Sequence, residues 1–138
     1  MKFEQKGDKL VDKNDIKELE LKYKVILPND YKDYMLEMNG LFSKKTLYFK
    51  PEIWGEDIEF FYVLPIKYGS DIFERANLKD EFFDFPENHI TIGVTYTGNI
   101  SMSLKESEYG SIYVFYSDGE MHKLANSFTE FLDGLKEL

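Results

Sequence analysis

The sequence predicts an α+β fold, a single domain spanning residues 1–138 in which about four helices pack on a mostly antiparallel sheet of five to six strands. Two observations support this prediction. Apolar residues recur at helical spacing up to Gly40, and from Thr46 onward the pattern changes to short segments rich in β-branched and aromatic residues. A helical pattern returns after Ser127 and closes the chain.

The first helix is expected to begin at Asp15. Asp15 and Glu18 have the spacing of a capping box, in which two side chains satisfy the free N–H groups of the first turn. The helix should end near Lys24, before a β-branched pair. Its buried face would consist of Ile16, Leu19 and Tyr23.

The stretch LPNDYKDYMLEMNG, residues 27–40, contains a second helix with its start and stop signals. Pro28 suits the first turn, because its missing N–H and its fixed φ cost nothing there. Asp30 favours the positive end of the helix dipole, and Gly40 provides a left-handed stop. We therefore expect a helix from about Pro28 to Asn39 whose apolar stripe belongs to the core. The stripe consists of Tyr31, Tyr34, Met35 and Met38.

Strands are expected at TLYFK (46–50) and IEFFYVLPI (58–66), because both segments are rich in β-branched and aromatic residues. The segment HITIGVTYTGNISMSL (89–104) should form two strands around a turn at Thr97-Gly98-Asn99. The segment GSIYVFYSDGEMHKL (110–124) should form a second hairpin, closed by Asp118-Gly119.

Two further helices are predicted from capping pairs. Asp71 with Glu74 should open a short helix that runs through Ile72, Phe73 and Leu78. Ser127 with Glu130 is a full capping box at the start of the last helix. The apolar face of that last helix would consist of Phe128, Phe131, Leu132 and Leu135.

The net charge of −9 is unevenly distributed. Residues 1–50 carry 11 Lys against 9 Asp and Glu, whereas residues 51–138 carry 6 Lys and Arg against 17 Asp and Glu, a balance of −11. Such a surface repels phosphate backbones and attracts basic proteins, although solubility alone also accounts for it. Neither a signal-peptide core nor an apolar run of membrane-spanning length is present, so we expect a cytoplasmic protein that binds neither nucleic acid nor membrane.

The sequence offers little chemistry. Without cysteine there is no thiolate nucleophile, and His89 and His122 lack neighbours at metal-ligand spacing, so each is expected at a strand end or on the surface. Asp57 and Glu59 would share one strand face, but a catalytic carboxylate pair needs a cleft, which spacing does not show. We therefore predict no catalytic residue, no cofactor and no metal site.

Two acidic segments carry aromatic residues suited to an interface: PEIWGEDIEF (51–60), which holds the sole tryptophan, and DEFFDFPE (80–87). In the alternative interpretation, the aromatic side chains point inward and the acids solvate the outside. We predict a partner-binding surface formed by Trp54, Glu56, Asp57, Glu59, Asp80, Glu81, Asp84 and Tyr96.

The chain resembles the SUKH superfamily, the group named after yeast cell-wall-synthesis regulators of the Smi/Knr type. The hallmark stretch matches at Leu27, Pro28, Asp30, Tyr31, Asn39 and Gly40. Four further stretches resemble the family in the right order: FPENHITIG with its Ile92-Gly93 step, GNISMSL, GSIYVFY, and LANSFTEFLDGL with Ala125, Ser127, Phe128, Phe131 and Leu132.

This resemblance implies a non-enzymatic binding domain. Small bacterial members of the family look like immunity proteins, which bind and neutralise a cognate polymorphic toxin, often a nuclease. The yeast relatives instead act as regulatory scaffolds, which remains the alternative. On either interpretation the matched motifs specify the fold. The expected partner is a basic protein toxin, bound by a monomer or weak dimer.

Overall fold

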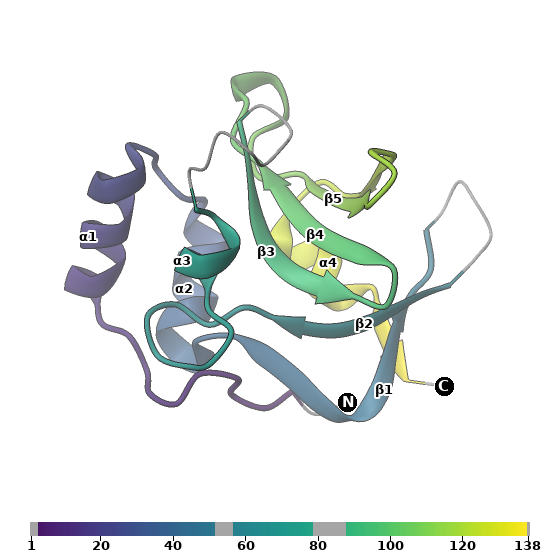
Figure 1. The fold of residues 1–138 in the computed structure, drawn as a ribbon, viewed down its shortest axis with the longest axis horizontal. Coiled ribbons are helices and arrows are strands. Elements are labelled where there is room, and N and C mark those ends of the chain that lie inside the picture. The colour runs from purple at the N-terminus through teal and green to yellow at the C-terminus, as the bar shows by residue number, and fades with distance from the viewer. Residues whose placement is uncertain (1–2, 52–56, 79–87, 138) are drawn as a thin grey trace.

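A computed structural model describes residues 3–51, 57–78 and 88–137 of the chain (Figure 1). The helices are α1 (Lys13–Tyr23), α2 (Asn29–Met38), α3 (Phe73–Ala76), the 3-10 turn η1 (Glu106–Glu108) and α4 (Phe128–Asp133). The strands are β1 (Leu41–Phe49), β2 (Ile58–Val63), β3 (His89–Thr95), β4 (Gly98–Ser103), β5 (Ile112–Tyr116), β6 (Met121–Ala125) and β7 (Leu135–Glu137). The predicted α+β class is confirmed.

The described strands form one antiparallel sheet of seven, in the order β6-β5-β4-β3-β2-β1-β7. The prediction of five to six strands was therefore slightly low. The extra strand is β7, whose first residue, Leu135, was expected in the last helix and instead pairs with Phe49 of β1. A strand of three residues is too short to show a period of two, so its pairing partner and not its own pattern makes it a strand.

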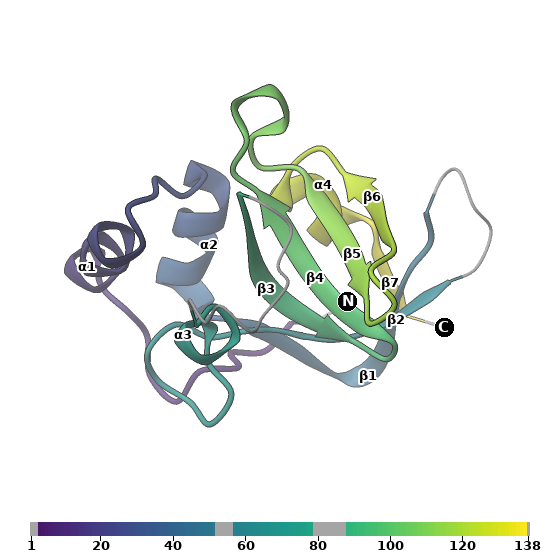
Figure 2. The ribbon, with the colours of Figure 1, turned by 45° about the horizontal axis from the view of Figure 1, so that its top comes forward.

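The sheet curls around α4, while α1, α2 and α3 gather beyond one end of the strands (Figures 1 and 2). The core lies between α4, α2 and the inner face of the sheet. Phe131 of α4 stacks on Phe49 at a ring-centre distance of 5.3 Å and meets Phe60 edge-on at 5.6 Å. Phe128 meets Tyr31 of α2 edge-on at 5.2 Å. The five rings come from four elements, α2, β1, β2 and α4, so α4 joins the helical part of the core to the sheet.

Helix α1 has its N-cap three residues earlier in the sequence than predicted. Asp12 is the N-cap: its carboxylate accepts from the Asp15 N–H at 2.8 Å, and the Asp15 carboxylate accepts from the Asp12 N–H at 3.0 Å. The predicted pair of Asp15 and Glu18 was wrong because acids spaced by three recur along this segment, and the pattern alone does not choose among them. The helix ends at Lys24, which is left-handed with φ of 56°, as expected.

Helix α2 confirms the prediction for the hallmark stretch. Tyr31 and Met35 are fully buried, and Tyr34 and Met38 are partly buried, so the apolar stripe belongs mainly to the core. The left-handed stop begins at Asn39, with φ of 44°, one residue before the predicted glycine.

Asn39 is also a structural tie. It is completely buried, and its side-chain amide donates to the carbonyls of Lys9 at 2.8 Å and Ile66 at 2.9 Å. Its side-chain oxygen accepts from the Ile66 N–H at 2.7 Å. Gly7 packs so closely that a Cβ there would lie 2.7 Å from the Asn39 amide nitrogen. One asparagine therefore fastens the N-terminal segment and the loop after β2 to the end of α2.

The two other predicted caps have different outcomes in the structure. Helix α3 follows Ile72 without a side-chain cap. The Asp71 carboxylate accepts from the Tyr62 hydroxyl, and Glu74 accepts from the Lys67 N–H at 3.1 Å. At α4, the Ser127 hydroxyl accepts from the Glu130 N–H at 3.1 Å, so the serine half of the predicted capping box is confirmed; the reciprocal bond to the Glu130 side chain is not formed. These outcomes differ because the carboxylates of Asp71 and Glu74 bind Tyr62 and Lys67, outside the helix, and not the first turn of α3.

The two predicted hairpins are present. Asp118-Gly119 closes β5 and β6, with Gly119 at φ of 90°. In the other hairpin, Gly98 opens β4 and does not sit in the turn, because its N–H donates to the Thr95 hydroxyl at 2.9 Å. The connection is therefore Tyr96-Thr97, which leaves Tyr96 at the tip of the hairpin.

Candidate partner-binding surface

The hallmark residues of the helix α2 stretch make contacts within the domain. The Asp30 carboxylate reaches the first turn of α4, where it accepts from the Thr129 N–H at 2.9 Å and from the Thr129 hydroxyl at 3.0 Å. Pro28 packs against Gly110, where an added Cβ would lie 3.5 Å from the proline ring. These contacts, with the buried Asn39, use the matched residues to join α2 to the rest of the domain. These matched residues are therefore engaged in the fold itself.

A hollow of about 320 Å³ opens where the start of β2, the β3–β4 turn and the end of β5 meet. We call it the turn hollow. It brings together the three predicted partner-binding residues that the structure describes, Asp57, Glu59 and Tyr96. Its remaining lining residues are Tyr48, Ile58, Thr97 and Tyr116.

Tyr96 is exposed yet fixed in place. Its side chain is 71% exposed, while its backbone N–H donates to the Glu59 carbonyl at 3.0 Å. Its ring meets the ring of Phe61 edge-on, with centres 6.3 Å apart. Phe61 is itself 42% exposed. An exposed aromatic pair that is held by the backbone loses little conformational freedom on binding, which favours its use at an interface.

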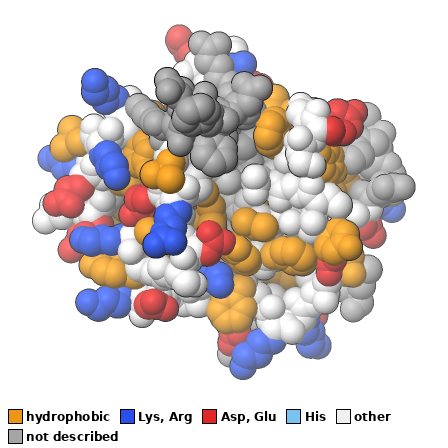
Figure 3. All heavy atoms as spheres, in the orientation of Figure 1, with side chains coloured by type: hydrophobic (Ala, Val, Ile, Leu, Met, Phe, Trp, Pro, Cys, Tyr) orange, Lys and Arg blue, Asp and Glu red, His pale blue; other side chains and the backbone are white. Residues whose placement is uncertain are grey.

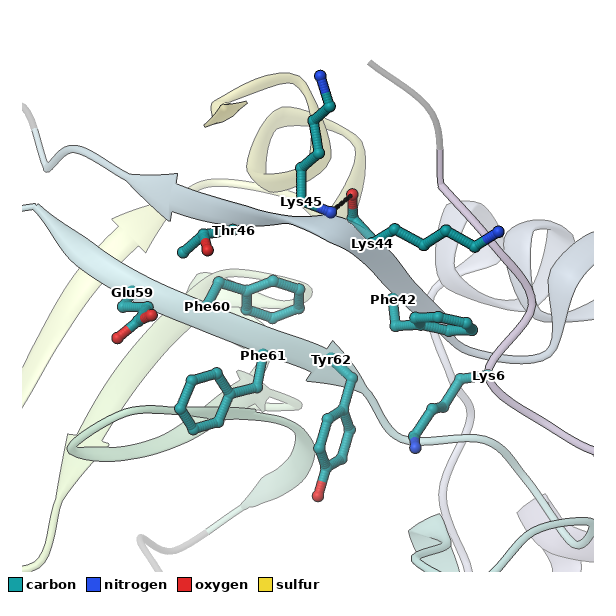
Figure 4. Close-up of a pocket in the computed structure, with 10 residues that line it drawn as sticks. Lys6, Phe42, Lys44, Lys45, Thr46, Glu59, Phe60, Phe61 and Tyr62 are labelled. Atoms are coloured by element: carbon teal, nitrogen blue, oxygen red, sulfur yellow. Dashed lines mark hydrogen bonds between the residues drawn. The ribbon is translucent and has the colours of Figure 1, made fainter. Parts of the chain in front are cut away.

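A second hollow, of about 400 Å³, lies beside the first and shares Glu59 with it. It exists because β1 bulges: Phe42 pairs with Tyr62 and Leu47 pairs with Phe60, so four residues of β1 face Phe61 alone. Figure 4 shows Phe61 and Tyr62 extending on the same side of β2. We call this the bulge hollow.

The lysines around the bulge hollow already have partners. The Lys44 amine lies 3.7 Å from the Glu4 carboxylate, and the Lys45 amine lies 3.9 Å from that of Glu137. The Lys6 amine lies 4.6 Å above the centre of the Tyr62 ring. The two ion pairs link the terminal segments to β1, and the Lys6 contact links the N-terminal segment to β2, so we assign the bulge hollow a structural role.

The face of the sheet turned away from α4 carries an apolar stripe that crosses six strands. Residues opposite one another in the pairing share a face, and all members are partly or fully exposed. Figure 3 shows hydrophobic side chains gathered across this face, over β2 and the strands beside it. The stripe runs through Phe42, Tyr62, Val94, Asn99, Phe115 and Met121, with Asn99 as its polar interruption.

One polar cluster on this sheet is enclosed. His89 Nδ1 lies 3.1 Å from the Ser101 hydroxyl, and its Nε2 lies 3.8 Å from the Glu108 carboxylate. Glu108 accepts from the hydroxyls of Tyr113 and Ser103. The Tyr113 hydrogen bond lowers the pKa of Glu108, and burial lowers the pKa of His89.

A hydroxyl, an imidazole and a carboxylate thus stand in series, as in a nucleophilic site. However, the Ser101 residue is 3% exposed and the His89 side chain 1% exposed, so a substrate has no approach to them. The cluster holds η1 against the sheet. His89 was expected at a strand end or on the surface; it begins β3, but its side chain is buried.

The other predicted partner-binding residues lie outside the described part of the chain: Trp54, Glu56, Asp80, Glu81 and Asp84. The sequence analysis missed Tyr48, Tyr116 and Phe61. A signal was available for Phe61, because it follows Phe60 in a strand and two neighbours cannot both face the core without a bulge. Nothing in the sequence linked Tyr48 or Tyr116 to Glu59.

Within residues 3–51, 57–78 and 88–137, no group of three or more His, Asp or Glu residues is placed to hold a metal ion. Over the same ranges, no helix has the length and apolar character needed to cross a bilayer.

The family model described as SMI1 / KNR4 family (SUKH-1) matches residues 10–134. The chain belongs to this family. It is also 29% identical over 104 residues to a Bacillus subtilis (strain 168) protein named "Uncharacterized protein YnaB". That match covers 75% of this chain and 58% of the relative, so the chain aligns with little more than half of that protein. No solved structure matches the chain.

Proposed function

We propose that this protein is an immunity protein that binds a cognate polymorphic toxin, a basic nuclease, and neutralises it without catalysing a reaction. The observation that carries this proposal is that the residues that form the fold differ from those that remain accessible on the surface. The family hallmark residues are used inside the fold, while an aromatic and acidic surface around the turn hollow remains open. This division supports a common fold that presents a member-specific binding face.

The charge of the chain supports a basic partner. A nuclease active site carries Lys and Arg to hold phosphates, and residues 51–138 carry 11 more acidic than basic groups. An acidic inhibitor is attracted to such a cleft and occludes it as a substitute polyanion. Attraction of this kind accelerates association by roughly 10–1000-fold over a neutral pair. Durable affinity needs a desolvated aromatic anchor, and Trp54 and Tyr96 are the candidates.

The test is rescue of a bacterial cell that expresses the toxin encoded beside this gene. We expect growth to be restored by the wild-type protein and purified toxin to bind it with a salt-dependent association rate. Asp57→Lys should slow association, whereas Glu18→Lys, which makes the same charge change on an exposed position of α1, should not. A salt-independent rate would contradict polyanion mimicry, and failure to rescue would contradict the immunity function.

The alternative is a regulatory scaffold of the same fold, a role that the family resemblance equally admits. It predicts several partners of moderate affinity in a pull-down and no toxin gene in the neighbourhood. One dominant toxin partner would exclude it.

A further inference from the structure

We propose that the turn hollow is a receptor for a single arginine side chain of the partner protein, and this inference rests on the proposed function. The guanidinium would lie against the tyrosine rings of the hollow and face the carboxylates of Asp57 and Glu59. The inference therefore names the chemical group of the partner that this face recognises.

The size of the hollow suits one side chain. Ligand pockets for small molecules run from about 300 to 1,000 Å³, so a hollow of about 320 Å³ is at the small end of that range. Its lining residues include Tyr48, Tyr96 and Tyr116, which come from β1, the β3–β4 turn and the end of β5. Three tyrosines from separate elements thus contribute to one hollow, which offers aromatic side chains for stacking against a planar group.

The charges of the hollow are available to a cation. In the part of the chain that the structure describes, neither Asp57 nor Glu59 has a Lys or Arg partner within ion-pair distance. Lys44 and Lys45 of the neighbouring bulge hollow are instead paired with Glu4 and Glu137. Asp57 is exposed and Glu59 is partly exposed, and both line the hollow with three tyrosines, a composition that complements a positive side chain.

Arginine fits this composition better than other occupants. An apolar side chain would cover the carboxylates without replacing their water, which costs free energy. An anion would be repelled. Lysine satisfies the charge, but its ammonium is compact and strongly hydrated, whereas the guanidinium is planar, weakly hydrated, stacks on aromatic faces and can bond a carboxylate with two N–H groups.

The experiment is an NMR titration of the full chain with N-acetyl-arginine amide, a probe that carries one guanidinium and no other charge. We expect saturable shifts, in the millimolar range, of the backbone amides of Asp57, Glu59, Tyr96 and Thr97. Capped citrulline has the same shape without the charge and should leave these amides unmoved. Capped lysine should bind more weakly than capped arginine.

Two variants locate the contact. Glu59→Gln removes the charge with little change in shape and should weaken arginine binding by about two- to fivefold, the range of an exposed ion pair. Tyr96→Ala should weaken it by a similar factor through the lost ring contact. Glu18→Gln on α1 is the matched control and should change nothing. Shifts spread over the acidic surface, equal binding of citrulline or lysine, or no shift at all would overturn the inference.

The outcome is separable from that of the proposed function. If the cell is rescued but capped arginine does not bind, the protein is an immunity protein that uses another face. If capped arginine binds in the hollow but no toxin is neutralised, the receptor stands and the partner is of another class.

Discussion

Replacing Asn39 by Ala should cost more stability than almost any other single polar change in this domain. The Asn39 side chain makes three hydrogen bonds in a completely buried position, two to backbone carbonyls and one from the Ile66 N–H. Alanine would leave the Ile66 N–H and both carbonyls without these partners. It would also have to adopt a left-handed conformation at φ of 44°, which asparagine tolerates better than alanine does.

The magnitude follows from these losses. Three neutral hydrogen bonds at about 1 kcal/mol each, together with about 1 kcal/mol for the left-handed alanine, amount to about 4 kcal/mol. The unfolding entropy of a domain of this size converts 1 kcal/mol into about 3–4 °C of Tm, so the midpoint should fall by about 12–16 °C. A loss of this size would remove a large fraction of the stability of a typical domain.

Circular dichroism during thermal and urea unfolding measures the effect. Asn99→Ala is the matched control, because Asn99 is an exposed asparagine on β4 and its replacement should stay within about 0.5 kcal/mol of the wild type. A loss below about 1 kcal/mol for Asn39→Ala would refute the view that Asn39 fastens three segments together. Normal stability with lost partner binding would instead make Asn39 a recognition residue.

Three further predictions concern a cap, the pKa of Glu108 and metal independence. Ser127→Ala should lower the free energy of unfolding by about 1 kcal/mol, and an unchanged urea midpoint would argue against the cap. Tyr113→Phe removes the hydroxyl that lowers the pKa of Glu108, so that pKa, followed by NMR, should rise toward its ordinary value. A carboxyl group whose pKa is lower in the folded state stabilises the fold at pH values above its unfolded-state pKa, and this stabilisation is lost as pH falls through the folded-state pKa. The wild type should therefore lose more stability than this variant between about pH 5 and pH 3. An equal loss in both proteins would show that the hydroxyl does not act on Glu108. Thermal unfolding in excess chelator should match that in buffer, and a Tm lowered by several degrees would reveal a structural metal.

Local signals in the sequence were enough to predict most elements. The α2 stretch combines a helical stripe with a proline at its start and Asn39-Gly40 at its end, and these act over single turns of chain. Asp118-Gly119 likewise specifies its hairpin, because the turn needs a residue with positive φ and glycine adopts it freely. The predicted number of strands was too low because β7 was missed. This strand depends on its pairing with β1 and not on its own sequence pattern.

The caps show where local signals become ambiguous. Asp12 with Asp15, and Asp15 with Glu18, both have the spacing of a capping box. The path of the chain before α1 selects the pair of Asp12 and Asp15. Asp71 was predicted to cap α3, but its carboxylate instead accepts a hydrogen bond from the Tyr62 hydroxyl on β2. A side chain bonds to whichever partner the fold brings nearest, and that partner can lie anywhere in the sequence.

The candidate site divides in the same way. The sequence by itself determined that this chain carries an acid surplus after residue 50, and it singled out Asp57, Glu59 and Tyr96. Only the tertiary structure decided that these three share a hollow with Tyr48 and Tyr116. Composition and periodicity act within one element, whereas the register of β2 against β1 and β3, and the bulges that shift it, fix which residues from distant strands meet.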